Sequence, residues 1–249
     1  MMLRAAIGFF TRLPVGSAPL PATFKGILAW LPVIGLPVGL CVALCTGLAR
    51  LVLPALPCGL LGCLVWVLVT GGLHLDGVAD CGDGMLVETT KEKRLAIMKD
   101  SRLGTFGGTA LFLVLGGKMA ALAELAGSCT TDWPAFLAFA GSCTMAAVLG
   151  RCLVFWAMRL PSARPDGLGE ALHRGMARRY ELLALVMGGG ICLLNGWRGL
   201  VSLGVALALT AFLLAAARKR LGGVTGDVFG CLVEVTEAAV LLVCCAFPA

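Results

Sequence analysis

Long apolar runs, separated by short polar connections, follow one another along nearly the whole chain. A helix that crosses a bilayer needs about 20 predominantly apolar residues, and most of these runs approach or exceed that length. The runs cover residues 26–49, 51–73, 105–126, 134–158, 182–197, 200–217 and 231–247. The pattern predicts an all-α, polytopic membrane bundle of about seven transmembrane helices. We expect it to fold as a single domain over residues 1–249.

The fifth and sixth runs are short and are separated only by Arg198 and its neighbours. They are compatible with a tight hairpin or with a partly re-entrant pair, and the glycines at 188–190 weaken the fifth run as a helix. In the first run, Gly35 and Gly39 form a GxxxG pattern, which predicts a helix-packing face. Residues 1–13 lack an uninterrupted apolar region, so we expect a short interfacial helix rather than a cleavable signal peptide.

Composition supports a membrane protein and excludes several other classes. Hydrophobic residues make up 59% of the chain and charged residues 14%, against about 25% charged in soluble domains. The net charge of +6 accompanies no long basic run and no aromatic platform, so we do not expect nucleic-acid binding. The 12 Cys form no CxxC pair and only 2 His are present, so the cysteines are interpreted as packing residues rather than zinc ligands.

The distribution of basic residues predicts the orientation. With a cytoplasmic N-terminus and seven spans, the cytoplasmic parts are the N-terminal segment and residues 74–104, 159–181 and 218–230. These parts carry all 20 Lys and Arg residues except Arg50, Lys118, Arg151 and Arg198. By the positive-inside rule, the chain is predicted to cross its membrane in this orientation, with these parts in the cytoplasm.

The acidic residues follow the same division, which the positive-inside rule does not require. All 14 Asp and Glu residues except Glu124 and Asp132 fall in or next to the cytoplasmic parts. We therefore expect a polar site that faces the cytoplasm.

The densest group of acids is Asp76, Asp80 and Asp83, spaced i, i+4 and i+7. On a helix these three carboxylates share one face, where they repel one another or bind a cation. Hard oxygen ligands suit Mg²⁺ or Mn²⁺. The alternative interpretation is that these acids lie at the start of a helix, where the helix dipole favours negative charge. We favour the metal site and expect the interleaved glycines to let ligands approach the backbone.

A second polar stretch surrounds Asp100 and Ser101, which Lys99 and Arg102 flank. A glycine-rich segment at 104–108 then opens the third apolar run. Free backbone N–H groups at a helix start, next to basic side chains, can cradle a phosphate. The same pattern is also explained by basic residues that commonly flank a membrane span, combined with helix capping. The spacing alone does not distinguish this interpretation from a phosphate site.

The last group joins Asp227 to two acids inside the seventh run, Glu234 and Glu237. A carboxylate within a span is costly, so we expect both glutamates to face a polar cavity, as further metal ligands or as a general base. Arg151, inside the fourth run, is predicted either to pair with an acid on another helix or to clamp a phosphate. Lys118 receives no functional role. The basic residues of 159–181 are interpreted most simply as lipid-facing charge, and attraction of an anionic substrate is the alternative.

Four segments together resemble the cobalamin synthase family of bacterial and archaeal corrinoid assembly. They are FFTRLP at 9–14, GGLHLDGVADCGDG at 71–84, IMKDSRLGTFG at 97–107 and GGVTGDVFGCLVEVTE at 222–237. Their order matches that of the family, and they extend over nearly the whole chain. Cys81 and Gly82 depart from the small residues common there, and residues 159–181 match weakly.

The resemblance implies an adenosylcobinamide-GDP ribazoletransferase that depends on Mg²⁺. Such an enzyme joins adenosylcobinamide-GDP to α-ribazole or its 5′-phosphate, and releases GMP with adenosylcobalamin or its 5′-phosphate. The expected metal ligands are Asp76, Asp80 and Asp83. The expected substrate-binding residues are His74, Lys99, Ser101, Arg102 and Arg151. The expected catalytic residues, one of them the proton acceptor, are Asp100, Asp227, Glu234 and Glu237.

Two other classes of protein share some of these features. A cation-coupled transporter also has many spans and intramembrane acids, but its site lies near the bilayer midplane rather than at one face. A scaffold that recruits cytoplasmic enzymes does not require three aligned aspartates. The sequence does not fix the oligomeric state, and a homo-oligomer is compatible with it.

Overall fold

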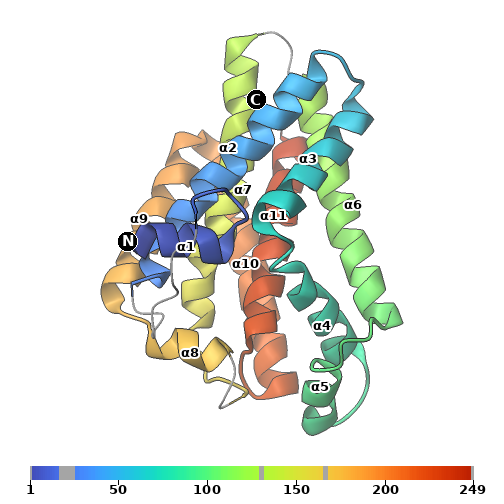
Figure 1. Cartoon of the computed structure of the whole chain (residues 1–249), viewed down its shortest axis with the longest axis vertical. Coiled ribbons are helices and arrows are strands. Elements are labelled where there is room, and N and C mark those ends of the chain that lie inside the picture. Colours follow the sequence, from blue (N-terminus) through green and yellow to red (C-terminus); the bar gives the residue numbers. More distant parts are fainter. Residues whose placement is uncertain (1, 17–25, 129–131, 165–167, 248–249) are drawn as a thin grey trace.

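The computed structural model describes residues 2–16, 26–128, 132–164 and 168–247, and its regular elements there are helices (Figure 1). They are α1 (Met2–Phe10), η1 (Leu28–Trp30), α2 (Leu31–Arg50), α3 (Ala55–Thr70), α4 (Leu75–Leu86), α5 (Lys91–Ile97), α6 (Thr105–Ser128), α7 (Trp133–Ala157), α8 (Leu168–Arg174), α9 (Arg178–Leu194), α10 (Gly196–Leu221) and α11 (Gly226–Ala246). The prediction of an all-α bundle is confirmed.

In the described part, five helices are long and apolar enough to cross a membrane, namely α2, α6, α7, α10 and α11. α3 reaches that standard only together with α4, at a bend of 94°, and α9 has 17 residues. A polytopic protein is confirmed, but the count of seven spans is not. The second apolar run ends early because Gly71 and Gly72 adopt positive φ angles of 66° and 67°, which stop α3 and turn the chain into α4.

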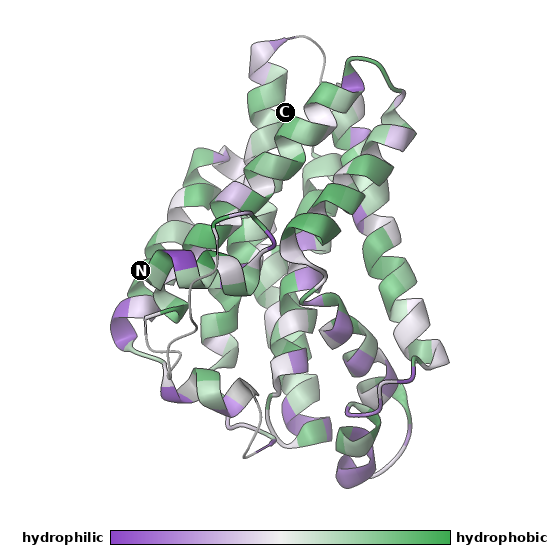
Figure 2. Cartoon of the chain, viewed as in Figure 1, coloured by the Kyte–Doolittle hydropathy of each residue, from purple (hydrophilic) through white to green (hydrophobic). Residues whose placement is uncertain are grey.

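Small residues lie where two helices pack closely. A Cβ atom added to Gly35 or Gly39 of α2 would collide with the backbone of Val148 or Thr144 in α7, so the predicted GxxxG packing face is confirmed. α9 ends at Leu194 and α10 begins at Gly196, so a tight connection joins the two helices, as the hairpin alternative predicts. Hydrophobic residues predominate along the long helices (Figure 2), and large apolar side chains such as Leu44 are exposed on them.

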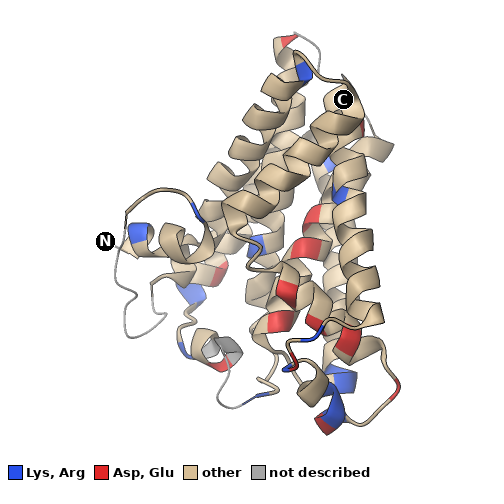
Figure 3. Ribbon diagram, turned by 45° about the vertical axis from the view of Figure 1, so that its right-hand side comes forward, with Lys and Arg blue, Asp and Glu red and all other residues tan. Residues whose placement is uncertain are grey.

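Charged residues gather towards one end of the bundle (Figure 3). We call this the polar end; it comprises α4, α5, α8, the starts of α6 and α11, the end of α10, residues 159–164 and the connections among them. Hydrogen bonds join the three predicted polar segments there: Arg164 donates to the Leu95 carbonyl at 3.2 Å, and the Ala163 N–H donates to the Val224 carbonyl at 2.8 Å. The described parts of residues 74–104, 159–181 and 218–230 are therefore grouped at this end, as predicted. The N-terminal segment, predicted for the same side, contacts the end of α3, where the Arg12 N–H donates to the Val69 carbonyl.

Candidate active site

α4 carries the aspartate group, and its glycines allow it to lie against two other helices. A Cβ atom on Gly77 would collide with the Asp227 carbonyl of α11, and one on Gly82 would lie 2.8 Å from the Phe106 carbonyl of α6. We expected these glycines to admit a ligand, but protein backbone already occupies the space beside both. Their function is close helix packing, which holds the carboxylates of α4 beside the starts of α6 and α11.

Asp83 caps α6. One carboxylate oxygen accepts from the Gly104 N–H at 2.7 Å, and the other accepts from the Gly107 N–H at 2.8 Å. A carboxylate at a helix start satisfies unpaired N–H groups and interacts favourably with the helix dipole. The glycine-rich start of α6 is therefore capped by a side chain of this chain, and these two N–H groups are not free to cradle a phosphate.

Asp76 and Asp80 lie on α4 near Asp227, and the like charges of Asp227 and Asp76 act on Asp80. Asp76 is exposed and Asp80 is half-buried. Within the described residues, no ion pair or hydrogen bond engages either carboxylate, although the charge of Arg164 opposes the repulsion at Asp80. Neighbouring carboxylates without a cation of their own suit a divalent ion.

A complete metal shell is not preformed: in the ranges that the structure describes, no three His, Cys, Asp or Glu side chains are placed to hold an ion. Mg²⁺ commonly binds through one or two carboxylates, with substrate phosphates and water completing its shell. The pair Asp76 and Asp80 therefore fits Mg²⁺ that is shared with a phosphorylated substrate.

Asp227 lies at the start of α11 with two partners. Arg164 donates to the Asp227 carboxylate at 3.0 Å, and the Thr225 hydroxyl donates to it at 3.2 Å. The Thr225 hydroxyl also accepts from the Val228 N–H, which caps α11. Sequence reasoning missed Arg164, because it lies in the weakly matching segment 159–181, where we interpreted the basic residues as lipid-facing charge.

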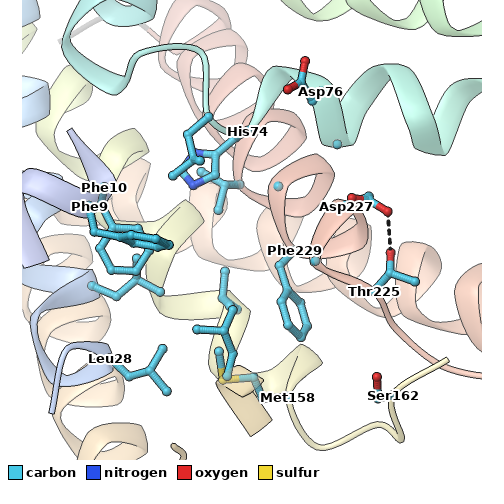
Figure 4. Close-up of a pocket in the computed structure, with 18 of the residues that line it drawn as sticks. Phe9, Phe10, Leu28, His74, Asp76, Met158, Ser162, Thr225, Asp227 and Phe229 are labelled. Atoms are coloured by element: carbon cyan, nitrogen blue, oxygen red, sulfur yellow. Dashed lines mark hydrogen bonds between the residues drawn. The ribbon is translucent and has the colours of Figure 1, made fainter. Parts of the chain in front are cut away.

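A cavity of 290 Å³ opens among α1, α2, α4, α7 and α11 (Figure 4). Polar groups line one side of it, and aromatic and aliphatic side chains line the other. The polar side consists of His74, Asp76, Ser162, Arg164, Thr225 and Asp227. The apolar side includes Phe9, Phe10, Leu28, Leu31, Leu73, Val154, Met158, Leu172, Phe229 and Val233. Such a cavity can hold an apolar ring at one end and hydroxyl or phosphate groups at the other.

Glu234 and Glu237 lie away from this cavity, in a buried network of ion pairs between helices. Lys118 of α6 contacts the two carboxylates at 2.6 and 2.5 Å, and Arg151 of α7 contacts Glu237 at 2.7 Å. Lys118 also lies 4.7 Å from the centre of the Trp66 ring. The side chains of this network are at most 3% exposed. The interhelical pair is therefore the correct alternative for Arg151, and Lys118 has a structural role.

His74 lies in the turn between α3 and α4, close enough to Arg151 and Glu237 to feel their charges. It is 8% exposed and lines the cavity. In Figure 4 it lies between the Phe9–Phe10 pair and Asp76. The buried ion-pair network therefore lies within electrostatic reach of His74.

The connection that carries Lys99, Ser101 and Arg102 is exposed at the polar end, outside the residues that line the cavity. Asp100 accepts three hydrogen bonds from the Arg102 side chain, the shortest at 2.6 Å. These bonds lower the pKa of Asp100 to about 2. Because a proton acceptor works best with a pKa near the working pH, this pairing makes Asp100 a weak general base.

Comparison with known proteins supplies the family. A family model described as cobalamin-5-phosphate synthase matches residues 2–245. The adenosylcobinamide-GDP ribazoletransferase of Ectopseudomonas mendocina (strain ymp) is 38% identical over 247 residues, which is 96% of each chain. The protein of that name from Escherichia coli O45:K1 (strain S88 / ExPEC) is 34% identical over 250 residues, again 96% of each chain. No solved structure matches the chain. Because the model and the relatives match nearly the whole length, the chain belongs to the cobalamin-5-phosphate synthase family.

Proposed function

We propose that this protein is an adenosylcobinamide-GDP ribazoletransferase that acts at the cytoplasmic face of the bacterial inner membrane. It joins adenosylcobinamide-GDP to α-ribazole or α-ribazole 5′-phosphate and releases GMP. The observation that carries the proposal is the cavity, because its apolar side suits an aromatic base and its polar side carries the Asp76 carboxylate together with the Asp227–Arg164 pair. The relatives that match the whole chain bear the name of this activity.

Asp76 and Asp80 would hold Mg²⁺ in this proposal. When bound, the ion supplies positive charge that offsets the diphosphate and the departing GMP. Asp83, which we also expected to bind metal, is better suited to position α6 against α4, because both of its oxygens accept backbone N–H groups.

Asp227 is the best-placed proton acceptor, since it alone of the four predicted catalytic acids lines the cavity. A ribose hydroxyl of the nucleoside passes its proton to Asp227 while its oxygen bonds to the cobinamide-side phosphorus. The bond from that phosphorus to the bridging oxygen breaks, and GMP leaves with both electrons of the bond. Glu234 and Glu237 have ion-pair partners and do not line the cavity, so we assign them to holding α11 against α6 and α7.

Arg164 is the proposed phosphate clamp, in place of the buried Arg151. Its planar guanidinium faces Asp227 at the cavity and is 18% exposed at the side chain. A bound diphosphate would compete with Asp227 for the guanidinium. The guanidinium would then stabilise the equatorial oxygens of the phosphorus under attack, and the Asp227 carboxylate would be free to accept a proton. Lys99, Ser101 and Arg102 remain proposed outer contacts for the same anionic substrate.

The test is GMP release and corrinoid product formation by the purified full-length protein in lipid vesicles. We expect GMP only when both adenosylcobinamide-GDP and an α-ribazole substrate are present, no turnover in EDTA, and recovery on adding excess Mg²⁺. GMP release without the nucleoside would indicate hydrolysis instead of transfer. Absence of product with both substrates and Mg²⁺ would overturn the proposed function.

A further inference from the structure

A second hollow in the molecule is a groove of 430 Å³ among α7, α9 and α10. It shares no lining residue with the cavity of the candidate active site. Apart from Arg159 and Glu181, its walls carry no charge: they are built from residues 149–156 of α7, residues 184–189 of α9, and Leu203 and Leu207 of α10. The two charged residues follow the end of α7 and begin α9, so the groove has one polar opening, at the polar end of the bundle.

Two glycines keep this groove open. A Cβ atom on Gly189 would meet no other atom of the described residues within 4 Å, and one on Gly188 would make an ordinary contact with Cys152 at 3.4 Å. Close helix packing therefore does not require these glycines, in contrast to Gly35 and Gly39 of α2. Because glycine weakens a helix relative to alanine, glycines in such a place indicate space for a molecule other than this chain.

The length of the groove matches one leaflet of a bilayer. Leu149 and Arg159 are ten positions apart, which corresponds to about 15 Å at the rise of an α-helix. Half of a hydrocarbon core of about 30 Å is the same distance. Trp156 lines the groove one turn before Arg159, and tryptophan is enriched where a membrane meets water. The groove therefore extends from the membrane surface to the middle of the bilayer, as a lipid acyl chain does.

The opening of the groove carries a guanidinium with donors to spare. Arg159 donates to Glu181 at 2.8 Å, and a guanidinium has five N–H donors. The Arg159 side chain is 63% exposed and that of Glu181 is 19% exposed, so the guanidinium extends outward past the carboxylate. Arg178 and Arg179, both exposed at the start of α9, add positive charge nearby. Basic pockets between membrane helices of this kind bind the headgroups of anionic lipids.

We propose that the groove among α7, α9 and α10 holds one acyl chain of an anionic phospholipid, with the lipid phosphate bound by Arg159. The lipid belongs to the leaflet at the polar end. Glu181 holds the guanidinium from one side, and its remaining N–H groups donate to the phosphate oxygens. The site is separate from the proposed transferase chemistry, and lipid binding is measured without turnover.

Photo-crosslinking tests the acyl-chain part of the site. Full-length protein is placed in phosphatidylcholine vesicles that contain phosphatidylglycerol with a diazirine in one acyl chain, and labelled peptides are identified after irradiation. Labelling should concentrate on α7, α9 and α10. Gly189→Leu puts a side chain into the groove and should remove most of this labelling. Gly190→Leu is the matched control, because its added atoms also meet open space but Gly190 does not line the groove.

The headgroup contact is tested with two probes that carry the same diazirine chain, one on phosphatidylglycerol and one on phosphatidylcholine. Wild-type protein should prefer the anionic probe. Arg159→Met should reduce that preference by about fivefold, the contribution of one basic residue near an anionic lipid. Arg174→Met is the control, since Arg174 is also an exposed arginine paired with a carboxylate, that of Glu170, but lies outside the groove.

Three results would overturn the proposal. Labelling spread evenly over the apolar helices, including the exposed leucines of α2 and α3, would indicate ordinary boundary lipid. Equal labelling by the two probes in the wild type would remove the phosphate contact. Crosslinks between two protein chains at the groove, in place of lipid, would put a second copy of this chain there. If Gly189→Leu does not fold, the fall in headgroup preference in Arg159→Met still decides.

Discussion

At the scale of single residues, Arg164 is the cation that lies closest to the carboxylates of the cavity. It donates to Asp227 and to the Leu95 carbonyl, so it connects α11 with α5 as well as facing the proposed phosphate position. Arg164→Met should lower kcat by about 10²–10³, the cost of losing one preorganised donor to a developing charge. Arg164→Lys should recover part of this loss, because it restores the charge without the planar fork. Equal activity of Met and Lys variants in GMP-release assays would contradict a clamp and leave Arg164 a structural residue.

Glu237 is expected to have a structural rather than a catalytic role. It is the shared anion of Lys118 and Arg151, so Glu237→Gln leaves two buried cations with one carboxylate between them. Breaking such a pair costs about 3–5 kcal/mol, and we expect a clearly lower midpoint of thermal unfolding in detergent.

A double variant is the control for this loss of stability. Lys118→Met combined with Glu234→Gln removes one cation and one anion, leaving Arg151 and Glu237 as a balanced pair, and should be more stable than Lys118→Met alone. If Glu237→Gln instead unfolds like the wild type but releases no GMP, Glu237 is part of the chemistry.

At the scale of helices, Asp83 connects α4 to the start of α6. Asp83→Ala removes both acceptors from Gly104 and Gly107 and should reduce stability by about 0.5–2 kcal/mol, as loss of a helix cap does. Asp83→Asn keeps one carbonyl oxygen and should retain most of the stability and the wild-type Mg²⁺ requirement. A shift in Mg²⁺ requirement as large as that of Asp80→Asn would show that Asp83 binds metal as well.

Local patterns in the sequence predicted those structural features that depend on residues close together in the chain. The spacing of Asp76, Asp80 and Asp83 predicted a helix with aligned carboxylates, and Gly35 and Gly39 predicted a packing face; both are present. The pattern did not reveal the bend at Gly71, because an apolar run continues through it and only the backbone angles stop the helix.

Long-range partners could not be predicted from spacing. Asp83 meets a helix start 21 residues later, and Lys118 meets acids more than 100 residues later. Arg164 lies in a segment whose basic residues look alike in sequence, and only packing against α11 distinguishes it. The predicted roles of the acidic residues therefore differ most from the structure where a cation far along the chain pairs with the carboxylate, or where a distant helix start donates hydrogen bonds to it.

At the scale of the whole molecule, the position of charge predicts how the bundle lies in the membrane. The polar end carries most Lys and Arg residues, so reporter fusions at Glu88 and Gly223 should read as cytoplasmic. Fusions at Asp132 and Arg198, at the other end, should read as external. A cytoplasmic signal at Asp132 together with an external signal at Gly223 would reverse the proposed orientation.

The central claim is that the chemistry takes place at the carboxylates of the polar end and uses Mg²⁺. Initial GMP release, titrated against Mg²⁺ for the wild type and for Asp76→Asn, Asp80→Asn and Glu88→Gln, tests it most directly. Glu88 is exposed at the same end but lines no part of the cavity, so Glu88→Gln is the matched control. We predict that both aspartate variants need at least 10-fold more Mg²⁺ for half-maximal rate, since loss of even a residue that only hydrogen-bonds to a metal ligand costs about 10–100-fold in metal affinity. Wild-type Mg²⁺ dependence in both aspartate variants, or full activity in EDTA, would contradict the account.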